Sequence, residues 1–400
     1  MLKCLDVLML KCSTVKMFLR NFYHRYFADG MTRELKELFW STAILDFAIS
    51  AVGVFEPIYL YTLGFSLSRI LIFYIAVYAL YFLLVPFGGK FARTHGYEHA
   101  ILFSTPFLIL FYLSLFAIPY HPFFIVSAII SLAIQKTLYW PGYHADFARF
   151  GKDGSRGKEI SNLVVLDSIV MILGPAFGGI VIATVGFKVL FIIVAFLILV
   201  SNLPLLTTPE KFKPVPFSYK DSMKRLVAPE NRRKLFAFSG FGEEHLAGYL
   251  WPIFIFLIIK EYVSIGFLVS ASVLVATILT LYIGRMTDEE GRHEVLKIGV
   301  IFTAFTWLMR VLVVSGVGVF MSDSLYRVSR RTVGVPLAAI IYEEAKKTSV
   351  MNSIVFLQMA LVLGKLVVSA LALVILFFFP DSWTAIFILG AAMTALYALI

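Results

Sequence analysis

The amino-acid sequence predicts an all-α membrane protein that crosses the bilayer many times. Of its 400 residues, 60% are hydrophobic and only 15% are charged, whereas soluble domains carry about 45–50% apolar and about 25% charged residues. The apolar residues form near-continuous runs without alternation, and these runs are too long for the strands of a membrane barrel. The composition therefore excludes a disordered chain, a coiled coil and a soluble enzyme, and indicates a bundle of transmembrane helices.

Twelve apolar runs are long enough to be transmembrane helices, and we number them spans 1 to 12. They cover residues 40–62, 69–88, 99–118, 121–141, 160–183, 186–206, 235–259, 263–284, 295–315, 317–341, 352–379 and 383–400. Most of the 35 Lys and Arg residues precede span 1 or follow an even-numbered span, whereas the opposite loops hold only Arg69, Lys188 and Lys260. Because cytoplasmic loops are rich in basic residues, we expect both termini in the cytoplasm and the protein in the plasma membrane.

An internal repeat divides these spans into two halves of six. A shift of 195 positions aligns Pro57 with Pro252, Gly89 with Gly284, Gly96 with Gly291 and Pro141 with Pro336, and a shift of 190 aligns Asn162 with Asn352 and Gly174 with Gly364. The predicted domains are residues 39–206, residues 235–400 and a basic cytoplasmic linker, residues 207–234. Duplicated halves around a site at the membrane midplane are typical of secondary transporters.

The basic N-terminal segment, residues 1–38, has two interpretations. It is either an amphipathic segment on the cytoplasmic membrane surface or an extension before an alternative start at Met31. Its apolar stretch is too short for a signal-peptide core, so we expect no cleaved leader.

The segment after span 8 carries a recognisable motif. Residues 284–293 read G-R-M-T-D-E-E-G-R-H and resemble the G-x-x-x-D-x-x-G-R-[RKH] gating loop of the major facilitator superfamily. Gly284 lets helices approach, Gly291 suits a tight turn, and Asp288 can pair with Arg292. The resemblance implies two six-helix halves that move a solute by alternating access. The alternative is that the loop only makes a turn.

The first half contains a degraded copy of this motif. Residues 89–98 read G-K-F-A-R-T-H-G-Y-E, so Gly89 and Gly96 persist, but Arg93 stands where the family has Asp. The cytoplasmic latch that the family builds on this acid is therefore not expected in the first half.

Span 5 contains a second pattern that resembles the family. Gly174, Pro175, Gly178 and Gly179 match the end of its helix-5 motif G-x-x-x-G-P-x-x-G-G, which is associated with antiporters, although Val170 replaces the upstream glycine. Small residues permit close helix packing and proline bends a helix. The span 5 pattern therefore indicates either an antiporter or close helix packing alone.

Charged residues inside the spans concentrate on every third helix. Spans 1, 4, 7 and 10 contain Asp46, Glu56, Lys136, Glu243, Glu244, Asp323, Arg327, Arg330 and Arg331, and the other spans contain Asp167, Arg310 and Lys365 away from their ends. Charge inside a membrane is costly and marks a functional site by default. The resemblance implies that these four helices line the central cavity, so we expect a polar pathway there.

Span 7 carries the predicted proton-coupling group. Glu243 and Glu244 are adjacent carboxylates within the membrane, and one of them can bind and release a proton near neutral pH; they point about 100° apart on a helix. His245 and Asp46 are further candidates. The alternatives are a structural hydrogen bond for His245 and, for the carboxylates, a salt bridge to an arginine of span 10.

The predicted substrate cavity draws polar and aromatic side chains from spans 4, 7 and 10. These are Gln135, Lys136, Trp251, Asp323, Arg327 and Arg330. Asp323, Arg327 and Arg330 share one helical face, and Gln135 is the repeat equivalent of Arg330. Cations from both halves suit an anionic substrate, unless they pair with the membrane carboxylates.

These observations predict a secondary active transporter. The first choice is proton-coupled efflux, or antiport, of an amphipathic compound. The alternatives are uptake or exchange of an organic anion and, from another class, a non-transporting protein such as a lipid scramblase or receptor. Residues 151–159 lack the Walker A spacing, and no metal-ligand or catalytic pattern occurs. We therefore expect no enzyme activity, no metal and no cofactor besides protons, and a monomer whose partners are membrane lipids and a small solute, without nucleic acid.

Overall fold

The structure is a computed structural model that describes residues 33–149, 156–207, 212, 214, 217–289, 291–346 and 350–399, and the regular secondary structure of these residues is entirely helical. The α-helices are α2 (Arg33–Gly53), α3 (Phe55–Thr62), α4 (Leu67–His95), α5 (Tyr97–Ala117), α6 (Phe123–Arg149), α7 (Arg156–Val185), α8 (Phe187–Ser201), α9 (Tyr219–Val227), α10 (Arg232–Ser239), α11 (Glu243–Ile259), α12 (Tyr262–Glu289), α13 (Arg292–Met309), α14 (Gly316–Lys346), α15 (Val350–Phe378) and α16 (Trp383–Thr394). Three short 3-10 turns extend them: η3 (Gly240–Gly242) joins α10 to α11, η4 (Arg310–Leu312) follows α13 and η5 (Ala395–Leu399) follows α16.

Ten helical segments in the described part of the chain are long and apolar enough to cross a membrane. They correspond to spans 1 to 9 and 11. Helix α14 has 31 residues, more than the about 20 that a crossing needs, but Asp323, Arg327, Arg330 and Arg331 make it too polar for this set. The segment Trp383–Leu399 is apolar but shorter. The all-helical, multi-pass architecture is therefore confirmed, while a total of twelve crossings stays a prediction.

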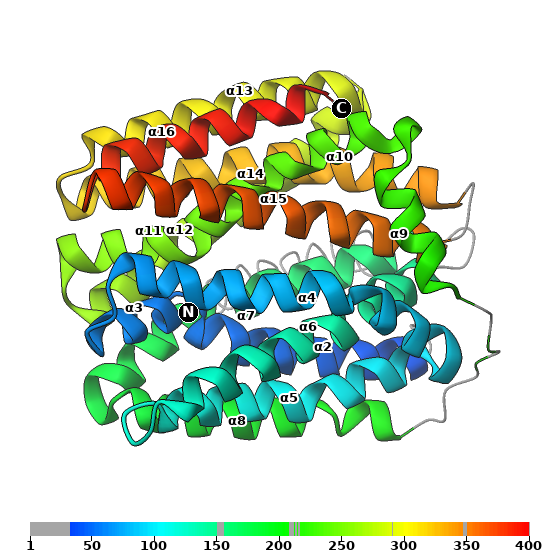
Figure 1. Cartoon of the computed structure of the whole chain (residues 1–400), viewed down its shortest axis with the longest axis horizontal. Coiled ribbons are helices and arrows are strands. Elements are labelled where there is room, and N and C mark those ends of the chain that lie inside the picture. Colours follow the sequence, from blue (N-terminus) through cyan, green and yellow to red (C-terminus); the bar gives the residue numbers. More distant parts are fainter. Residues whose placement is uncertain are drawn as a thin grey trace, which may run out of the picture.

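The helices form two groups that follow the order of the chain. Helices α2–α8 occupy the lower part of Figure 1 and helices α10–α16 the upper part. We call them the first and second helical groups. Helix α9 lies at one end of the bundle, between the two groups in the chain. The basic segment before residue 33 and most of the linker before residue 217 lie outside the described residues.

One seam between the groups is formed by α7 and α12, whose backbones nearly touch. A β-carbon added at Gly179 would lie 2.4 Å from a backbone carbonyl oxygen of α12, and one at Gly266 would lie 2.4 Å from a carbonyl oxygen of α7. The backbone N–H of Ala176 donates a hydrogen bond to Ser270 Oγ (3.0 Å). Small residues allow this approach, as in other close membrane-helix pairs.

The other two glycines of the span 5 pattern serve a different contact. A β-carbon at Gly174 would come within 1.8 Å of Ser50 Oγ, and one at Gly178 within 1.8 Å of the carbonyl oxygen of Ala51. Helix α7 thus packs with one face on α2 and with another on α12. The span 5 pattern thus supplies the α7 glycines at both of these helix contacts.

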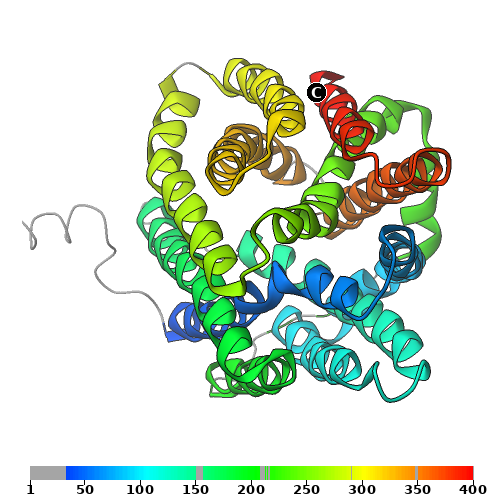
Figure 2. The same ribbon diagram turned by 90° about the vertical axis from the view of Figure 1, so that its left-hand side faces the viewer.

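A second seam, between α4 and α15, is built from side chains. The Tyr81 hydroxyl donates a hydrogen bond to Gln358 Oε1 (3.0 Å). A β-carbon at Gly89 would lie 2.6 Å from Val355 Cγ2. In the end-on view the two seams lie on opposite sides of the molecule (Figure 2).

The two motif segments are mostly helical, which corrects the predicted loops over residues 89–98 and 284–293. Helix α4 continues to His95 and α12 to Glu289, because a helix that leaves the hydrocarbon can keep its backbone hydrogen bonds in water. The turns are confined to Gly96 (φ 118°) and Gly291 (φ 93°), which start α5 and α13. Positive φ favours glycine at both positions. The side chains of Asp288 and Arg292, and the surroundings of Gly284, lie outside the described residues.

Candidate substrate and coupling site

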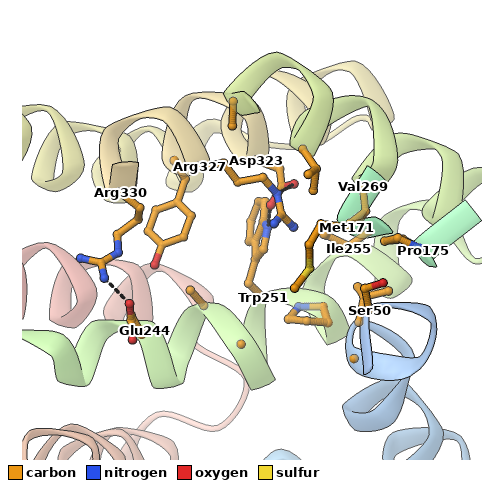
Figure 3. A pocket seen from close by; sticks show the side chains of 18 of the residues that line it. Ser50, Met171, Pro175, Glu244, Trp251, Ile255, Val269, Asp323, Arg327 and Arg330 are labelled. Carbon is orange, nitrogen blue, oxygen red and sulfur yellow. Dashed lines mark hydrogen bonds and ion pairs between the residues drawn. The ribbon is translucent and has the colours of Figure 1, made fainter. Parts of the chain in front are cut away.

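A cavity of about 430 Å³ opens between α2, α7, α11, α12 and α14 (Figure 3). Its volume is in the range of small-molecule sites. Its wall is formed by Ile49, Ser50, Gly53, Val54, Met171, Pro175, Glu244, Ala247, Gly248, Trp251, Pro252, Ile255, Val269, Val273, Ala276, Asp323, Tyr326, Arg327, Arg330 and Arg331. Helices α2, α7 and α12 contribute a mainly apolar surface, and α11 and α14 contribute the charges.

Arg330 holds both carboxylates of the acidic pair on α11. Its Nε lies 3.2 Å from Glu243 Oε1, and its Nη2 forms an ion pair with Glu244 Oε1, which Figure 3 shows as a dashed line. Its Nη1 donates a hydrogen bond to the Tyr397 hydroxyl (2.7 Å). The salt bridge that was the alternative interpretation of these carboxylates is therefore present, and Arg330 is the shared partner.

The two adjacent glutamates have different surroundings. Glu243 is fully buried, and its Oε2 accepts hydrogen bonds from Trp307 Nε1 (2.8 Å) and from the Tyr326 hydroxyl (2.7 Å). Glu244 lines the cavity, its side chain is 38% exposed, and its Oε2 lies 3.9 Å from Lys365 Nζ. Only Glu244 can meet a solute in the cavity directly.

Asp323 forms a second charged pair on the cavity wall. Its Oδ2 lies 2.7 Å from Arg327 Nε, one helical turn further along α14. Its Oδ1 accepts a hydrogen bond from Trp251 Nε1 (3.0 Å). Figure 3 shows Arg327 beside Asp323 and Trp251. The predicted internal pair is present, and Trp251 lines the cavity as expected.

Arg310, in turn η4, lies behind this wall and was not chosen from the sequence. Its residue is fully buried, and its guanidinium carbon lies 4.1 Å from the Trp251 ring, 4.0 Å from the Trp307 ring and 4.3 Å from the Tyr326 ring. None of its three guanidinium nitrogens has a hydrogen-bond acceptor among the described residues. Aromatic faces attract cations, so the three rings form a cage for this charge.

A network of tyrosine hydroxyls and rings lies between α3, α4 and α11. The Tyr74 hydroxyl donates a hydrogen bond to Glu56 Oε1 (2.7 Å), and the Tyr74 ring stacks on Tyr249 with centroids 3.5 Å apart. The hydroxyls of Tyr78 and Tyr249 lie 3.3 Å apart. This network joins the first helical group to the second.

His245 belongs to this second network. Its Nδ1 shares a hydrogen bond with Ser369 Oγ, and its ring meets the edges of Tyr78 and Tyr249, with centroids 4.7 Å apart in both cases. His245 is fully buried and does not line the cavity. Its surroundings match the structural alternative, a hydrogen bond that orients the ring.

Three other predicted residues lie away from the cavity wall. Lys136 Nζ is 5.5 Å from the centre of the Tyr78 ring, Gln135 is buried on α6, and Asp46 lies half-buried on α2. Of the two repeat-related helices, α6 (span 4) and α14 (span 10), only α14 contributes residues to the cavity wall. Arg330 and Gln135 therefore do not face one solute site.

The residues that the sequence reading missed are mostly aromatic hydrogen-bond donors. Tyr74, Tyr78 and Tyr81 recur at i, i+4 and i+7, which places three hydroxyls on one face of an otherwise apolar helix. This spacing is a usable signal for the α4 network. Trp307 and Tyr326 carried no such pattern.

The fold is all-helical and multi-pass, and its cavity combines an apolar surface with charged groups. The sequence model of the Major Facilitator Superfamily matches residues 38–260, more than half of the chain. The chain belongs to this superfamily, whose members are transporters and not enzymes. A protein of Lactococcus lactis subsp. lactis (strain IL1403), the "Multi-drug resistance efflux pump PmrA homolog", is 24% identical over 349 residues, covering 81% of this chain and 84% of that protein.

Proposed function

We propose that this transporter exports an amphipathic compound in exchange for protons, by alternating access of its two helical groups. The cavity carries the proposal, because it combines an extended apolar wall with a carboxylate, Glu244, that is exposed to the solute space and paired to Arg330. The efflux name of the Lactococcus relative supports the direction. Protons are the only coupling ion needed, and the working unit is a monomer surrounded by lipid.

The proposal includes a topology of twelve crossings. Helix α14 and the segment Trp383–Leu399 complete the set, since the charges of α14 meet partners on α11 and within α14 itself. The concentration of basic residues at even-numbered loops supports cytoplasmic termini and a plasma-membrane location. The two transport domains are residues 39–206 and 235–400, joined by residues 207–234, and the turns at Gly96 and Gly291 lie at their cytoplasmic gates.

Glu244 is the proposed coupling carboxylate, and Glu243 is a positioning residue. A proton on Glu244 neutralises one of the two anions that hold Arg330 and so frees the guanidinium to rearrange. Glu243 keeps Arg330 on the wall through its buried pair and is itself fixed by Trp307 and Tyr326. Release of the proton on the opposite side restores the pair.

Purified protein in liposomes tests this assignment. A pH gradient is imposed, and the movement of three fluorescent solutes is followed: the neutral N-phenyl-1-naphthylamine, the anionic 1-anilinonaphthalene-8-sulfonate and the cationic ethidium. Glu244→Gln is expected to abolish gradient-driven movement but to retain counterflow exchange, in which no net proton moves. Glu230→Gln, a charge-neutralising control at an exposed carboxylate outside the cavity wall, is expected to keep both.

Two results would contradict the proposal. Unchanged pH dependence in the double variant Glu243→Gln/Glu244→Gln rules out both carboxylates as coupling groups. Absence of saturable flux for all three solutes, from a folded wild-type chain, argues for a protein that does not transport.

Exchange of an organic anion is the second candidate function. Arg327, Arg330 and Arg331 all line the cavity, and the Arg327 side chain is 34% exposed. This candidate predicts 1-anilinonaphthalene-8-sulfonate flux without a pH gradient and a loss of that flux in Arg327→Gln.

A further inference from the structure

We propose that the caged Arg310 sets the charge selectivity of the cavity, so that it accepts neutral and anionic amphipathic compounds and rejects cationic ones. The inference rests on the proposed function only in taking the cavity as the solute site. It names a selectivity residue on a helix that contributes no side chain to the cavity wall.

The first step is the position of the charge. Trp251 and Tyr326 each contact the Arg310 guanidinium and each line the cavity. The positive charge is thus separated from the solute space by a single layer of aromatic rings. A solute group packed against the cavity side of Trp251 would lie roughly 8 Å from the guanidinium, since each contact with a ring takes about 4 Å.

The second step is the balance of charge around the cage. The three carboxylates of the site, Glu243, Glu244 and Asp323, each already have a closer cation. Their partners among the described residues are Arg330, Arg327 and, at 3.9 Å from Glu244, Lys365. Arg310 adds a further positive charge, without an acceptor on any of its nitrogens. With Arg331 also on the wall, the site carries a surplus of positive charge.

The third step is the effect of that surplus on a solute. Charges that lie about 8 Å apart in a medium of low dielectric interact much more strongly than in water. A cation in the cavity is repelled by Arg310, and the rings that would bind it already hold a cation on another side. A neutral compound is unaffected, and an anion is attracted. The aromatic wall therefore selects against cations, although exposed aromatic faces alone would attract them.

The hydrogen bonds of the cage rings tie this charge to the coupling site. Trp251 donates to Asp323, and Trp307 and Tyr326 donate to Glu243. Each ring turns a polar edge to a carboxylate and a face to Arg310, so the guanidinium cannot reach those carboxylates directly. The arrangement explains why this fully buried arginine has no salt bridge to the residues that the structure describes.

Calorimetric binding to the full chain in detergent micelles tests the inference with three probes of matched shape. They are naphthalene-1-sulfonate, 1-naphthylmethanol and (1-naphthylmethyl)trimethylammonium, each corrected for its uptake by empty micelles. In the wild type, the sulfonate is expected to bind about tenfold more tightly than the ammonium. Arg310→Gln is expected to lower this ratio about threefold or more, since the surplus charge of Arg331 remains, while the affinity for the alcohol stays the same.

Matched variants separate the charge from other effects. Arg310→Lys retains the charge and is expected to keep the ratio, and Arg232→Gln, which removes an exposed arginine of α10, is also expected to keep it. Arg310→Met removes the charge with a different side-chain volume and replaces Arg310→Gln if that variant does not fold. If neither variant folds, the ratio of sulfonate to ammonium affinity measured for the wild type supports or overturns the inference.

Three results would overturn the inference: equal or tighter binding of the ammonium by the wild type, no binding of any probe, or an unchanged ratio in a folded charge-removing variant. Failure of the proposed function looks different. A chain that prefers the sulfonate in calorimetry but moves no solute in liposomes keeps the selectivity and loses the transport mechanism.

Discussion

The two sides of helix α11 differ in how they hold their neighbours. Toward α14, the contacts are ion pairs: Arg330 with Glu243 and Glu244. Toward α4, the contacts are the hydroxyl pair of Tyr78 and Tyr249 and the stacked rings of Tyr74 and Tyr249. The charged side stays inside the second helical group, whereas the tyrosine side crosses from one group to the other.

This difference bears on the proposed alternating access, in which the two helical groups move against each other. A buried ion pair is costly to separate because each charge is left in a medium of low dielectric. A neutral hydrogen bond contributes about 0.5–1.5 kcal/mol net and can be exchanged for another. The contacts that alternating access must break are therefore the weak ones, and the strong ones can move as a rigid unit.

The largest effect is expected on the charged side. Arg330→Met leaves both Glu243 and Glu244 without their main cation, which costs about 3–5 kcal/mol for a buried pair that loses one partner. Thermal unfolding in micelles, followed by tryptophan fluorescence, should show the largest fall in Tm of the variants compared here. Arg331→Met, an exposed arginine one position further on, is the matched control. Equal Tm values for the two variants would contradict the ionic role of Arg330.

An intermediate effect is expected at Glu56 of α3, the acceptor at the edge of the tyrosine side. Tyr74→Phe removes the hydroxyl that donates to this buried carboxylate, and leaving a buried acceptor unsatisfied costs about 1–3 kcal/mol. The double variant Glu56→Met/Tyr74→Phe removes both partners, so its Tm should recover toward the wild type. A double variant that is less stable than Tyr74→Phe alone would show that Glu56 has another essential partner.

A smaller effect on stability, with a visible effect on rate, is expected between the groups. Tyr249→Phe removes the hydroxyl pair with Tyr78, worth about 0.5–1.5 kcal/mol, and counterflow exchange in liposomes should change by a factor of about 2–10 as one conformational state loses this contact. Tyr78→Phe removes the same pair from the other side. The double variant should change the rate no further, and additive changes would refute the shared contact.

The smallest effect is expected at an exposed ion pair. Lys297 and Glu294 lie 2.9 Å apart on α13 with side chains 67% and 63% exposed. Lys297→Ala should change stability by less than about 0.5 kcal/mol, measured by the same thermal unfolding. A loss as large as that of Arg330→Met would mean that burial does not set the difference between the two sides of α11.

Much of the architecture is readable from the sequence because the membrane imposes long apolar runs. The concentration of charge on every third helix points to α2, α11 and α14, which line the cavity, but also to α6, which contributes no residue to its wall, and it does not point to α7 and α12, which do. The i, i+4 spacing alone identifies the Asp323–Arg327 pair. The superfamily match agrees with the resemblance of residues 284–293, although it covers the other part of the chain.

The remaining features depend on tertiary structure. Which of Glu243 and Glu244 faces the cavity is decided by the rotation of α11, which starts at a 3-10 turn over Gly240–Gly242. The helix extensions through His95 and Glu289 follow no hydropathy signal, because they lie beyond the hydrocarbon. Arg310 reads in the sequence as an isolated charge within span 9, and only the packing of rings from three separate segments turns it into a caged cation.

The glycine contact between α7 and α12 has a mechanical consequence. With a carbonyl oxygen 2.4 Å from where a β-carbon would stand at Gly179 and at Gly266, no side chain separates the two backbones, so this line can serve as a fulcrum. In a rigid rotation, displacement grows with distance from the axis, and the α4–α15 seam lies on the far side of the molecule. A tilt of a few degrees about the α7–α12 contact would then separate α4 from α15 widely, while α7 and α12 stay packed against each other.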